Sequence, residues 1–276
     1  DLPEPEAPRA GEITVRLSAS SLNYHDLLVA ISPRSEGRLI PMADGAGVVV
    51  AVGEGVEEFA VGDSVVSCFF PQWQSGHHVP THFATVPGDG VDGFARGAVT
   101  LPATAFTHAP KGYSPAEAAT LTTAGLTAWR ALVVDGRIKA GDTVLVLGSG
   151  GVSVMALQMA RAMGARVIAT SSSAEKARRL RALGAEAVID YKATPDWGDA
   201  VLDATGGRGA DIVVEVGGPG TLAQSIRAVA PGGHIALIGV LTGFAGDVPT
   251  AALMARQASL KGLIVGSREQ QQDMVR

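Results

Sequence analysis

The chain has 276 residues, a formal net charge of −5, 46% hydrophobic residues and 18% charged residues, which is typical of a soluble globular protein with two domains. This charge gives no electrostatic reason to expect nucleic acid or an anionic membrane surface as a partner. The single cysteine, Cys68, excludes an intrachain disulfide framework and a structural zinc site of four cysteines. No apolar run is long enough to cross a bilayer and no signal-peptide pattern opens the chain, so we expect no membrane partner and a cytoplasmic location.

The N-terminal part is predicted to be rich in β-structure. Apolar runs at 13–17, 47–52 and 64–70 indicate strands, and a glycine turn follows the second of them at 53–55. Short strands joined by glycine turns favour a small barrel-like domain. Residues 71–97 are rich in Pro, Gly and His with little periodicity, so we expect a loop there with one strand near 81–86.

The pattern changes at Ser114, where Ser114, Pro115 and Glu117 occupy the N-cap, N1 and N3 positions of a predicted helix. Strands and helices then alternate. Predicted strands lie at 143–147, 166–170, 187–190, 212–216, 234–240 and 260–265, and predicted helices begin near Val152, Ala174, Asp196 and Pro219, with another at 249–256. Such alternation indicates an α/β fold with a doubly wound parallel sheet.

The stretch from Thr143 to Ser153 joins a buried strand to a helix through a glycine-rich turn. Gly148 and Gly150 match a GxGxxG spacing whose third position holds Ser153. Gly148 permits the tight turn, Gly150 permits close approach of a ligand, and the helix N-terminus offers free N–H groups to a pyrophosphate. The predicted backbone donors are Gly150, Gly151 and Val152. A plain structural turn is the competing interpretation, and Ser153 either adjusts helix packing or contacts the phosphates.

The end of the second Rossmann strand indicates which nucleotide is bound. The strand 167–170 runs into Ser171 and Ser172 with no acid at its end, and Lys176 follows with Arg178 and Arg179. A hydroxyl-rich, basic surround suits the 2′-phosphate of NADP(H), whereas NAD is marked by an acid at this place. The alternatives are that Ser172 and Glu175 form a capping box beside a solvated basic face, or that Glu175 turns to a ribose.

Several motifs in fixed order carry a family resemblance. They are Ser21–Leu27, Asp44–Val49, Val61–Val65, Leu121–Ala128, the glycine turn and Gly232–Ile235. With them the chain resembles the medium-chain dehydrogenase/reductase superfamily, in its zinc-independent quinone oxidoreductase-like and alcohol dehydrogenase-like branch. The resemblance implies a GroES-like catalytic domain over 1–122 and an NADP-binding Rossmann domain over 123–276. It also implies that the segment by which relatives return to the catalytic domain is absent, since the chain stops at Arg276.

The resemblance also allows a prediction of whether the chain binds a catalytic zinc ion. The positions that match the catalytic zinc ligands of zinc-dependent relatives hold Asn23, Ala43 and Thr123, and the acid beside the second of them is Asp44. None of the three is a competent zinc anchor and one carboxylate does not hold zinc, so we predict no metal. Elsewhere, a group that contains Cys68, His77, His78 and His82 is either a metal site or a surface loop with incidental histidines, and His82 is alternatively packed on a strand face.

Asn23, Tyr24 and Thr123 are the predicted catalytic residues, because they lie on those same motifs. Tyr24 is either a proton donor or a core aromatic residue, His25 and Asp26 orient their loop, and Asp44 is expected to be a buried, hydrogen-bonded carboxylate. The predicted cofactor-binding residues are Thr127, Gly148, Gly150, Gly151, Val152, Ser171, Ser172, Lys176, Tyr191, Val216, Gly217, Gly239, Val240 and Leu241.

Hydride transfer without a metal suits a substrate in which hydrogen bonds suffice to stabilise the developing oxyanion or enolate. We therefore predict an NADPH-dependent reductase of quinones or of alkenes conjugated with a carbonyl, acting on a small molecule as a homodimer. Two alternatives stay open, an NAD(P)-dependent alcohol dehydrogenase or carbonyl reductase, and a nucleotide-binding sensor or structural protein with little turnover.

Overall fold

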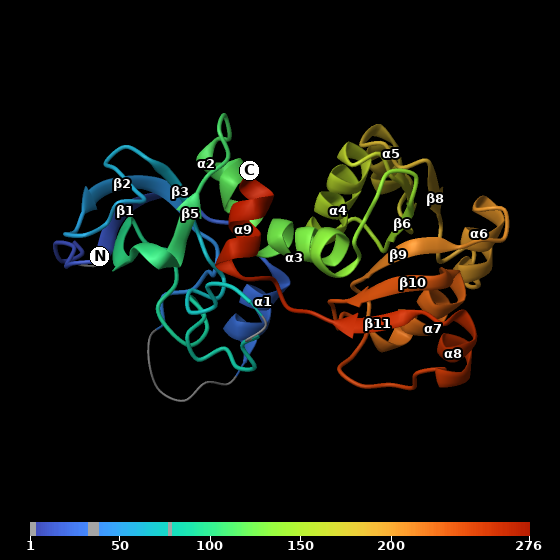
Figure 1. Cartoon of the computed structure of the whole chain (residues 1–276). Helices are drawn as coiled ribbons and strands as arrows, with labels where there is room; N and C mark the ends of the chain where they lie inside the picture. Colours follow the sequence, from blue (N-terminus) through green and yellow to red (C-terminus); the bar gives the residue numbers. More distant parts are fainter. Residues whose placement is uncertain (1–3, 33–38, 77–78) are drawn as a thin grey trace. The chain divides into compact units, whose positions relative to one another are not determined.

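The computed structural model describes residues 4–32, 39–76 and 79–276. The chain divides into two units (Figure 1), the first made of Asp1–Leu126 with Val265–Arg276 and the second of Thr127–Ile264. We predicted a boundary between residues 122 and 123 and placed everything after it in the second domain. Val265–Arg276 instead belongs to the first unit, because helix α9 (Arg268–Val275) packs against strand β5 (Phe106–His108).

The first unit is built on a five-stranded antiparallel sheet in the order β4-β1-β2-β3-β5. Its remaining strands are β1 (Glu12–Ala19), β2 (Ala46–Val52), β3 (Ser64–Ser67) and β4 (Ala98–Pro102). The strands predicted at 13–17 and 47–52 are confirmed. The third is shorter than predicted: it ends at Ser67, and the Cys68 N–H bonds to the carbonyl of Ala105 in the 3-10 turn that precedes β5.

Four features of this unit differ from the prediction. Helix α1 (Tyr24–Ile31) and strands β4 and β5 were not predicted. The strand predicted near 81–86 was wrong: the chain there forms consecutive turns, in which the N–H of Val86 bonds to Phe83 and that of Gly90 bonds to Val86. Gly88 follows in the next turn with φ at +77°, in the left-handed region that glycine adopts readily.

Helix α2 (Pro115–Ala119) begins with the predicted capping box, in which Ser114 and Glu117 each bond to the other's backbone. After it the chain winds more loosely in a π-helical turn, η2 (Leu121–Gly125), then tightens in α3 (Leu126–Trp129) and loosens again in η3 (Arg130–Asp135). Such π turns inside α-helices are frequent at functional sites, and this one carries Thr123.

The second unit contains a six-stranded parallel sheet in the order β11-β10-β9-β6-β7-β8. The strands are β6 (Thr143–Val146), β7 (Arg166–Thr170), β8 (Ala187–Ile189), β9 (Ala210–Glu215), β10 (Val229–Leu237) and β11 (Ser259–Gly262). The helices are α4 (Gly151–Ala162), α5 (Ala174–Ala182), α6 (Trp197–Ala204), α7 (Pro219–Ala228) and α8 (Thr250–Arg256). The predicted doubly wound α/β fold is confirmed, since the order runs outward in both directions from β6 and β9.

Helices cover both faces of this sheet, as Figure 1 shows. Alternate residues of β6 face opposite cores: Val144 and Val146 pack with α4 and α5, and Leu145 packs with α6 and α7. A strand buried on both faces must be apolar throughout, which explains the uninterrupted run from Val144 to Leu147. In the described parts of the chain, no helix has the length and apolar character needed to cross a membrane.

Candidate active site

Helix α1 begins with a capping box that positions Asn23. Asn23 is the N-cap, and Asp26 Oδ2 accepts the Asn23 N–H at 2.8 Å. The other oxygen of Asp26 accepts the Ala43 N–H at 3.1 Å. One buried carboxylate therefore fixes both the helix start, which we predicted to be a loop, and the segment just before β2.

Asn23 and Thr123, two of the predicted catalytic residues, meet on Asp44. Asn23 Nδ2 donates to Asp44 Oδ2 at 2.8 Å, and Thr123 Oγ1 donates to Asp44 Oδ1 at 2.5 Å. Asp44 is completely buried, and this burial raises the pKa of its carboxyl from 3.8 to about 7, although the hydrogen bonds from Thr123 and Asn23 act in the opposite direction. The expectation of a buried, hydrogen-bonded carboxylate is confirmed.

Tyr24 and His25 lie on α1 beside this cluster in the sequence. Tyr24 is 47% exposed, which rules out the interpretation of it as a core aromatic residue, and its hydroxyl has no hydrogen-bond partner among the described residues. His25 Nε2 lies 2.9 Å from Asp89 Oδ2, and the His25 ring packs against Phe69 and Phe83. His25 therefore ties α1 to the segment after β3.

A metal site was predicted to be absent at the zinc-ligand positions. Within 4–32, 39–76 and 79–276, no three His, Cys, Asp or Glu side chains gather where they could hold an ion, but metal independence stays a prediction. Of the second candidate group, Cys68 is buried and burial raises the pKa of its thiol to about 12. His82 is exposed in a loop and is not packed on a strand, and His77 and His78 lie outside the described residues.

The glycine turn after β6 has the geometry that a pyrophosphate needs. Gly148 has φ +72°, and its N–H donates to Thr170 Oγ1 at 3.0 Å. Gly150 is the N-cap of α4, and a Cβ built there would meet no atom within 4 Å. Among the described residues no side chain caps α4, and the N–H of Val154 is the first to bond back, to Gly150 O. The amides of Gly151 and Val152 thus remain for an anion.

Ser153 has a role that the sequence left open. Its hydroxyl donates to the carbonyl of Leu147 at 2.6 Å, and the side chain is buried between helix and strand. In a GxGxxG turn the third glycine serves close packing of helix on strand. Here a hydrogen bond holds the same junction, so Ser153 belongs to the packing and not to the anion site.

The segment after β7 presents the predicted 2′-phosphate residues. Ser172 Oγ donates to Tyr191 Oη at 3.0 Å, and Lys176 is exposed without a carboxylate partner in the described chain. The alternative capping box of Ser172 and Glu175 was wrong, because Ser173 is the N-cap of α5 and Glu175 pairs with Arg179. Ser171 is buried and its hydroxyl accepts the Ser173 N–H, so this residue shapes the turn.

Glu215, which the sequence analysis did not single out, organises the loop after β9. Its carboxylate is fully buried and accepts the N–H groups of Gly217 and Gly218 at 2.7 and 3.0 Å and the hydroxyls of Thr221 and Ser225. An acid at the end of an otherwise apolar strand was the signal that could have found it. Asp44, which the sequence analysis did name, is likewise an acid next to an apolar strand, in the motif Asp-Gly-Ala-Gly.

The other predicted cofactor residues lie near the carboxyl ends of strands. Val216 and Gly239 are half-buried and close together, because a Cβ on Gly239 would lie 2.0 Å from the Val216 carbonyl oxygen. Val240 is half-buried, Leu241 is 56% exposed, and Thr127 is buried at the start of the second unit. Ligands of doubly wound sheets bind at this edge.

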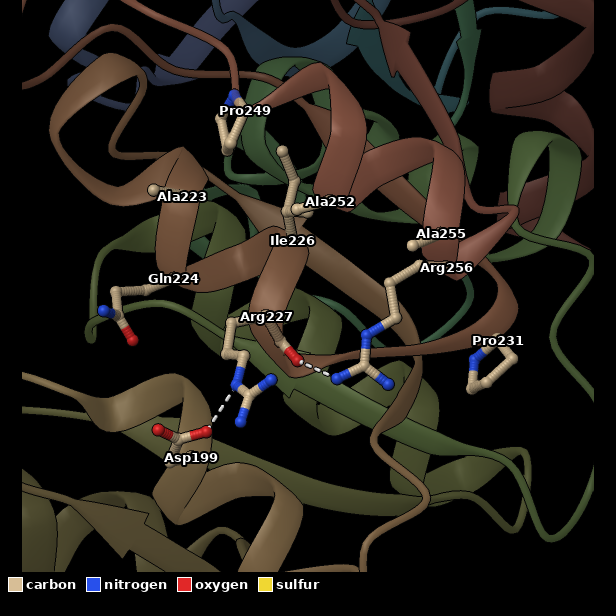
Figure 2. A pocket seen from close by; sticks show the side chains of 10 residues that line it. All are labelled: Asp199, Ala223, Gln224, Ile226, Arg227, Pro231, Pro249, Ala252, Ala255 and Arg256. Carbon is tan, nitrogen blue, oxygen red and sulfur yellow. Dashed lines mark hydrogen bonds and ion pairs between the residues drawn. The ribbon is translucent and has the colours of Figure 1, made fainter.

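A surface hollow of about 660 Å³ lies elsewhere in the second unit, over α6, α7 and α8 (Figure 2). Asp199 and Arg227 form an ion pair across it, and Arg256 donates to the Arg227 carbonyl at 2.8 Å. None of the predicted site residues lines this hollow. Its charged side chains already have partners, so we assign the candidate site to the strand ends and not to this hollow.

Comparisons with known proteins agree with this geometry. Residues 9–111 match the family described as alcohol dehydrogenase GroES-like domain, and residues 151–276 match the zinc-binding dehydrogenase family. A zinc-type alcohol dehydrogenase-like protein of Schizosaccharomyces pombe (strain 972 / ATCC 24843) is 43% identical over 283 residues, which cover 98% of this chain and 81% of that protein. The fold and these matches define a dehydrogenase-type oxidoreductase. The chain belongs to the medium-chain dehydrogenase/reductase superfamily.

Solved structures give the same result. A protein of Sinorhizobium meliloti 1021 that is described as a candidate alcohol dehydrogenase has 44% identity and a TM-score of 0.92, with 99% of this chain and 81% of that one covered. An NAD-dependent alcohol dehydrogenase has 39% identity and a TM-score of 0.87, covering 100% and 82%. A quinone oxidoreductase of Pseudomonas syringae pv. tomato DC3000 has 31% identity and a TM-score of 0.79, covering 98% and 79%.

Proposed function

We propose that this chain is a metal-free, NADPH-dependent oxidoreductase that transfers hydride to quinones or to alkenes conjugated with a carbonyl. The observation that carries the proposal is the Asp44 cluster. Asn23 and Thr123 stand at positions that match zinc ligands of relatives, and both are hydrogen-bonded to a buried carboxyl instead. Ala43 at the third such position has no donor atom in its side chain, so the set lacks the thiolate and imidazole groups that zinc requires.

The second unit supports a nicotinamide dinucleotide. Gly150, Gly151 and Val152 offer backbone donors to the pyrophosphate, and the open space at Gly150 suits its close approach. The loop that Glu215 holds, together with Gly239 and Val240, supports the nicotinamide end. When bound, NADPH supplies the hydride.

The choice of NADPH over NADH rests on Ser172, Tyr191 and Lys176. Two hydroxyls 3.0 Å apart and an ammonium without a carboxylate partner in the described chain form a donor set for a phosphate dianion. Glu175, the acid nearest in sequence to this set, pairs with Arg179.

Quinones and conjugated alkenes suit a site without a Lewis acid. In both, the charge that forms on hydride addition is delocalised onto an oxygen, where a hydrogen-bond donor stabilises it. An unactivated alcohol or aldehyde depends more strongly on a metal that polarises its oxygen.

The first experiment measures metal content and turnover on freshly purified protein. We expect less than 0.1 zinc per chain by elemental analysis, and NADPH oxidation with a naphthoquinone or an enone that persists after treatment with a chelator. Stoichiometric zinc whose removal abolishes turnover refutes the metal-free reaction. NADPH binding without oxidation by quinones, enones or aldehydes instead supports a sensor or structural protein.

The second experiment tests the nucleotide with Lys176→Ala. Loss of one charge-assisted hydrogen bond, at about 1.5 to 3 kcal/mol, is expected to raise the Kd for NADPH by about 10- to 100-fold and to leave the Kd for NADH unchanged. Lys111→Ala, an exposed lysine of the first unit, is the matched control. An equal loss of affinity for both nucleotides contradicts the 2′-phosphate assignment.

A second candidate function is an NAD(P)-dependent alcohol dehydrogenase or carbonyl reductase. It is favoured by the identities of 43% and 39% with an alcohol dehydrogenase-like relative and an NAD-dependent alcohol dehydrogenase. Faster oxidation of alcohols with NAD than reduction of quinones or enones with NADPH selects this candidate. The expected homodimer is checked by sedimentation of the same preparation, and the cytoplasmic location stays a prediction.

A further inference from the structure

Asp44 is enclosed in the first unit, and each of its two carboxyl oxygens has a hydrogen-bond partner. Oδ1 faces Thr123 Oγ1 at 2.5 Å and Oδ2 faces Asn23 Nδ2 at 2.8 Å. Its backbone carbonyl accepts the Ser20 hydroxyl at 2.7 Å. Asp44 itself is 0% exposed, whereas its partners Thr123 and Asn23 are only half-buried.

The count of donors in this cluster restricts what Thr123 and Asn23 can offer to a substrate. Thr123 has one hydroxyl proton, and an ionised Asp44 takes it. The two amide protons of Asn23 point to Asp44 Oδ2 and to the carbonyl of Ser21 at 3.3 Å. With Asp44 ionised, both side chains therefore present acceptor atoms and no donor to an oxygen that gains negative charge.

A proton on Asp44 reverses this arrangement at Thr123. A protonated carboxyl has an O–H of its own, which can donate to Thr123 Oγ1 across the same 2.5 Å. The Thr123 hydroxyl proton is then free to point away from Asp44. Asn23 lacks this freedom, because an amide does not pass a proton on.

We propose that Asp44 and Thr123 form a proton relay in which Thr123 donates its hydroxyl proton to the substrate oxygen while Asp44 replaces that proton. This inference rests on the proposed function and adds a source for the proton of that reaction. Thr123 is the catalytic residue of the pair, and Asp44 acts through it.

The atoms and electrons balance over one turnover. Hydride from NADPH forms a C–H bond at the β-carbon of an enone, and the C=C electron pair shifts so that the carbonyl oxygen gains the charge. The Thr123 O–H bond breaks as that oxygen takes the proton, and the Asp44 O–H bond breaks as Thr123 regains one. A solvent proton then returns to Asp44 by the reverse path through Thr123, so one hydride and one proton are consumed. For a quinone the hydride adds to an oxygen and the proton to the other oxygen.

The surroundings keep Asp44 able to change its protonation state near neutral pH. Burial raises the pKa of the Asp44 carboxyl to about 7, and the negative charge of Asp26 acts in the same direction. The other groups that bear on it, Thr123, Asn23 and Ser21, are neutral. A general acid works best when its pKa lies near the working pH.

The test uses full-length Thr123→Val, Thr123→Ser and Asp44→Asn, with methyl vinyl ketone and 1,4-naphthoquinone as substrates. Val matches Thr in shape without the hydroxyl, Ser keeps the hydroxyl, and Asn keeps the size of Asp without an acidic proton. Thr122→Val is the matched control, because Thr122 is a buried neighbour whose hydroxyl bonds to the Ser67 carbonyl at 2.9 Å and not to Asp44. Circular dichroism and the Kd for NADPH verify folding.

We expect kcat of the wild-type chain to fall as pH rises through about 7, together with a solvent deuterium isotope effect. Thr123→Val and Asp44→Asn are expected to lose about 10²- to 10⁴-fold in kcat at pH 6, with flat pH profiles, while Thr123→Ser stays within about tenfold of the wild-type chain. The double variant is expected to be no worse than the worse single one, because the two residues act as a unit.

Infrared titration gives a readout without turnover. The carboxyl band lost in Asp44→Asn should titrate near pH 7 in the wild-type chain, and at higher pH in Thr123→Val because the Thr123 hydrogen bond lowers the Asp44 pKa. Two outcomes overturn the relay alone, provided that the wild-type chain turns over a substrate. One is an Asp44→Asn variant that keeps the wild-type pH profile, and the other is a Thr123→Val variant whose kcat stays within threefold of wild type. If Asp44→Asn does not fold, the two Thr123 variants decide. No turnover of any acceptor by the wild-type chain refutes the proposed function and the relay together.

Discussion

Replacement of Asp44 by Asn is expected to change the stability of the protein in a way that depends on pH. The unfolded chain releases the Asp44 proton near pH 3.8, whereas the folded chain holds it until about pH 7. Between these values the folded state binds more protons, so its stability falls as pH rises. The shift of about three pH units, at about 1.36 kcal/mol per unit, amounts to about 4 kcal/mol.

An accessible part of this range lies between pH 5 and pH 8. The wild-type chain is expected to lose about 2.7 kcal/mol more than Asp44→Asn over it, because about two pH units of the shift fall there. At about 2 to 4 °C per kcal/mol this corresponds to a difference of about 5 to 10 °C in Tm. Differential scanning calorimetry at pH 5 and pH 8 measures this difference in Tm, in the unfolding transition that the Asp44→Asn substitution shifts.

The control is Glu54→Gln, which removes the same charge from an exposed position of the first unit. Its Tm should follow that of the wild-type chain at both pH values. If Asp44→Asn also follows the wild-type Tm within about 2 °C, Asp44 titrates as a solvated carboxyl does, and the reasoning from its burial is refuted.

Three more substitutions test the second unit. Gly150→Ala should leave stability within about 1 kcal/mol, because φ is −75° and nothing lies within 4 Å of the new methyl group, but should raise the Kd for NADPH at least about tenfold; unchanged affinity in fluorescence titration contradicts the pyrophosphate site. Ser153→Ala should lose about 1 kcal/mol of stability in urea denaturation and keep its NADPH affinity, and a tenfold weaker affinity would place the hydroxyl at the phosphates. Glu215→Gln should lose about 1 to 3 kcal/mol and weaken NADPH binding, because an amide NH2 replaces the oxygen that accepts the Ser225 hydroxyl and the other three donors lose a charged acceptor; wild-type values in both assays would show that the loop does not depend on this carboxylate.

The Rossmann sheet could be predicted from the sequence because each strand carries its own pattern. The bounds predicted for β7 are those observed, and α5 and α7 begin at the predicted Ala174 and Pro219. A strand buried on both faces is apolar at every position, so no knowledge of its neighbours is needed to recognise it. The observed termini of β10 and β11 differ from the predicted ones. Pairing with neighbouring strands decides where a strand ends, and a single sequence does not show which strands pair.

Helix α1 could not be predicted in this way. Its only buried residue is a carboxylate, Asp26, while Leu27 and Ile31 are exposed. The usual apolar stripe toward a core is therefore missing, and the helix is defined by its capping box instead. The sequence named Asn23, Thr123 and Asp44 separately, but which atoms bond to which depends on how the chain folds around Asp44.

The helix α9 makes the first unit discontinuous in sequence, and this affects how the nascent chain folds. Arg268 Nη2 lies 2.6 Å from Glu58 Oε1, and Gln271 donates to the carbonyl of Ser67 and the hydroxyl of Thr107. Because domains fold as they emerge from the ribosome, Thr127–Ile264 is complete before these contacts form. The contacts of α9 with the first unit therefore form after residues 127–264 have been synthesised. To isolate the first unit, a short linker must join Leu126 to Val265, because a fragment that ends at Leu126 lacks the partners of Glu58 and Thr107.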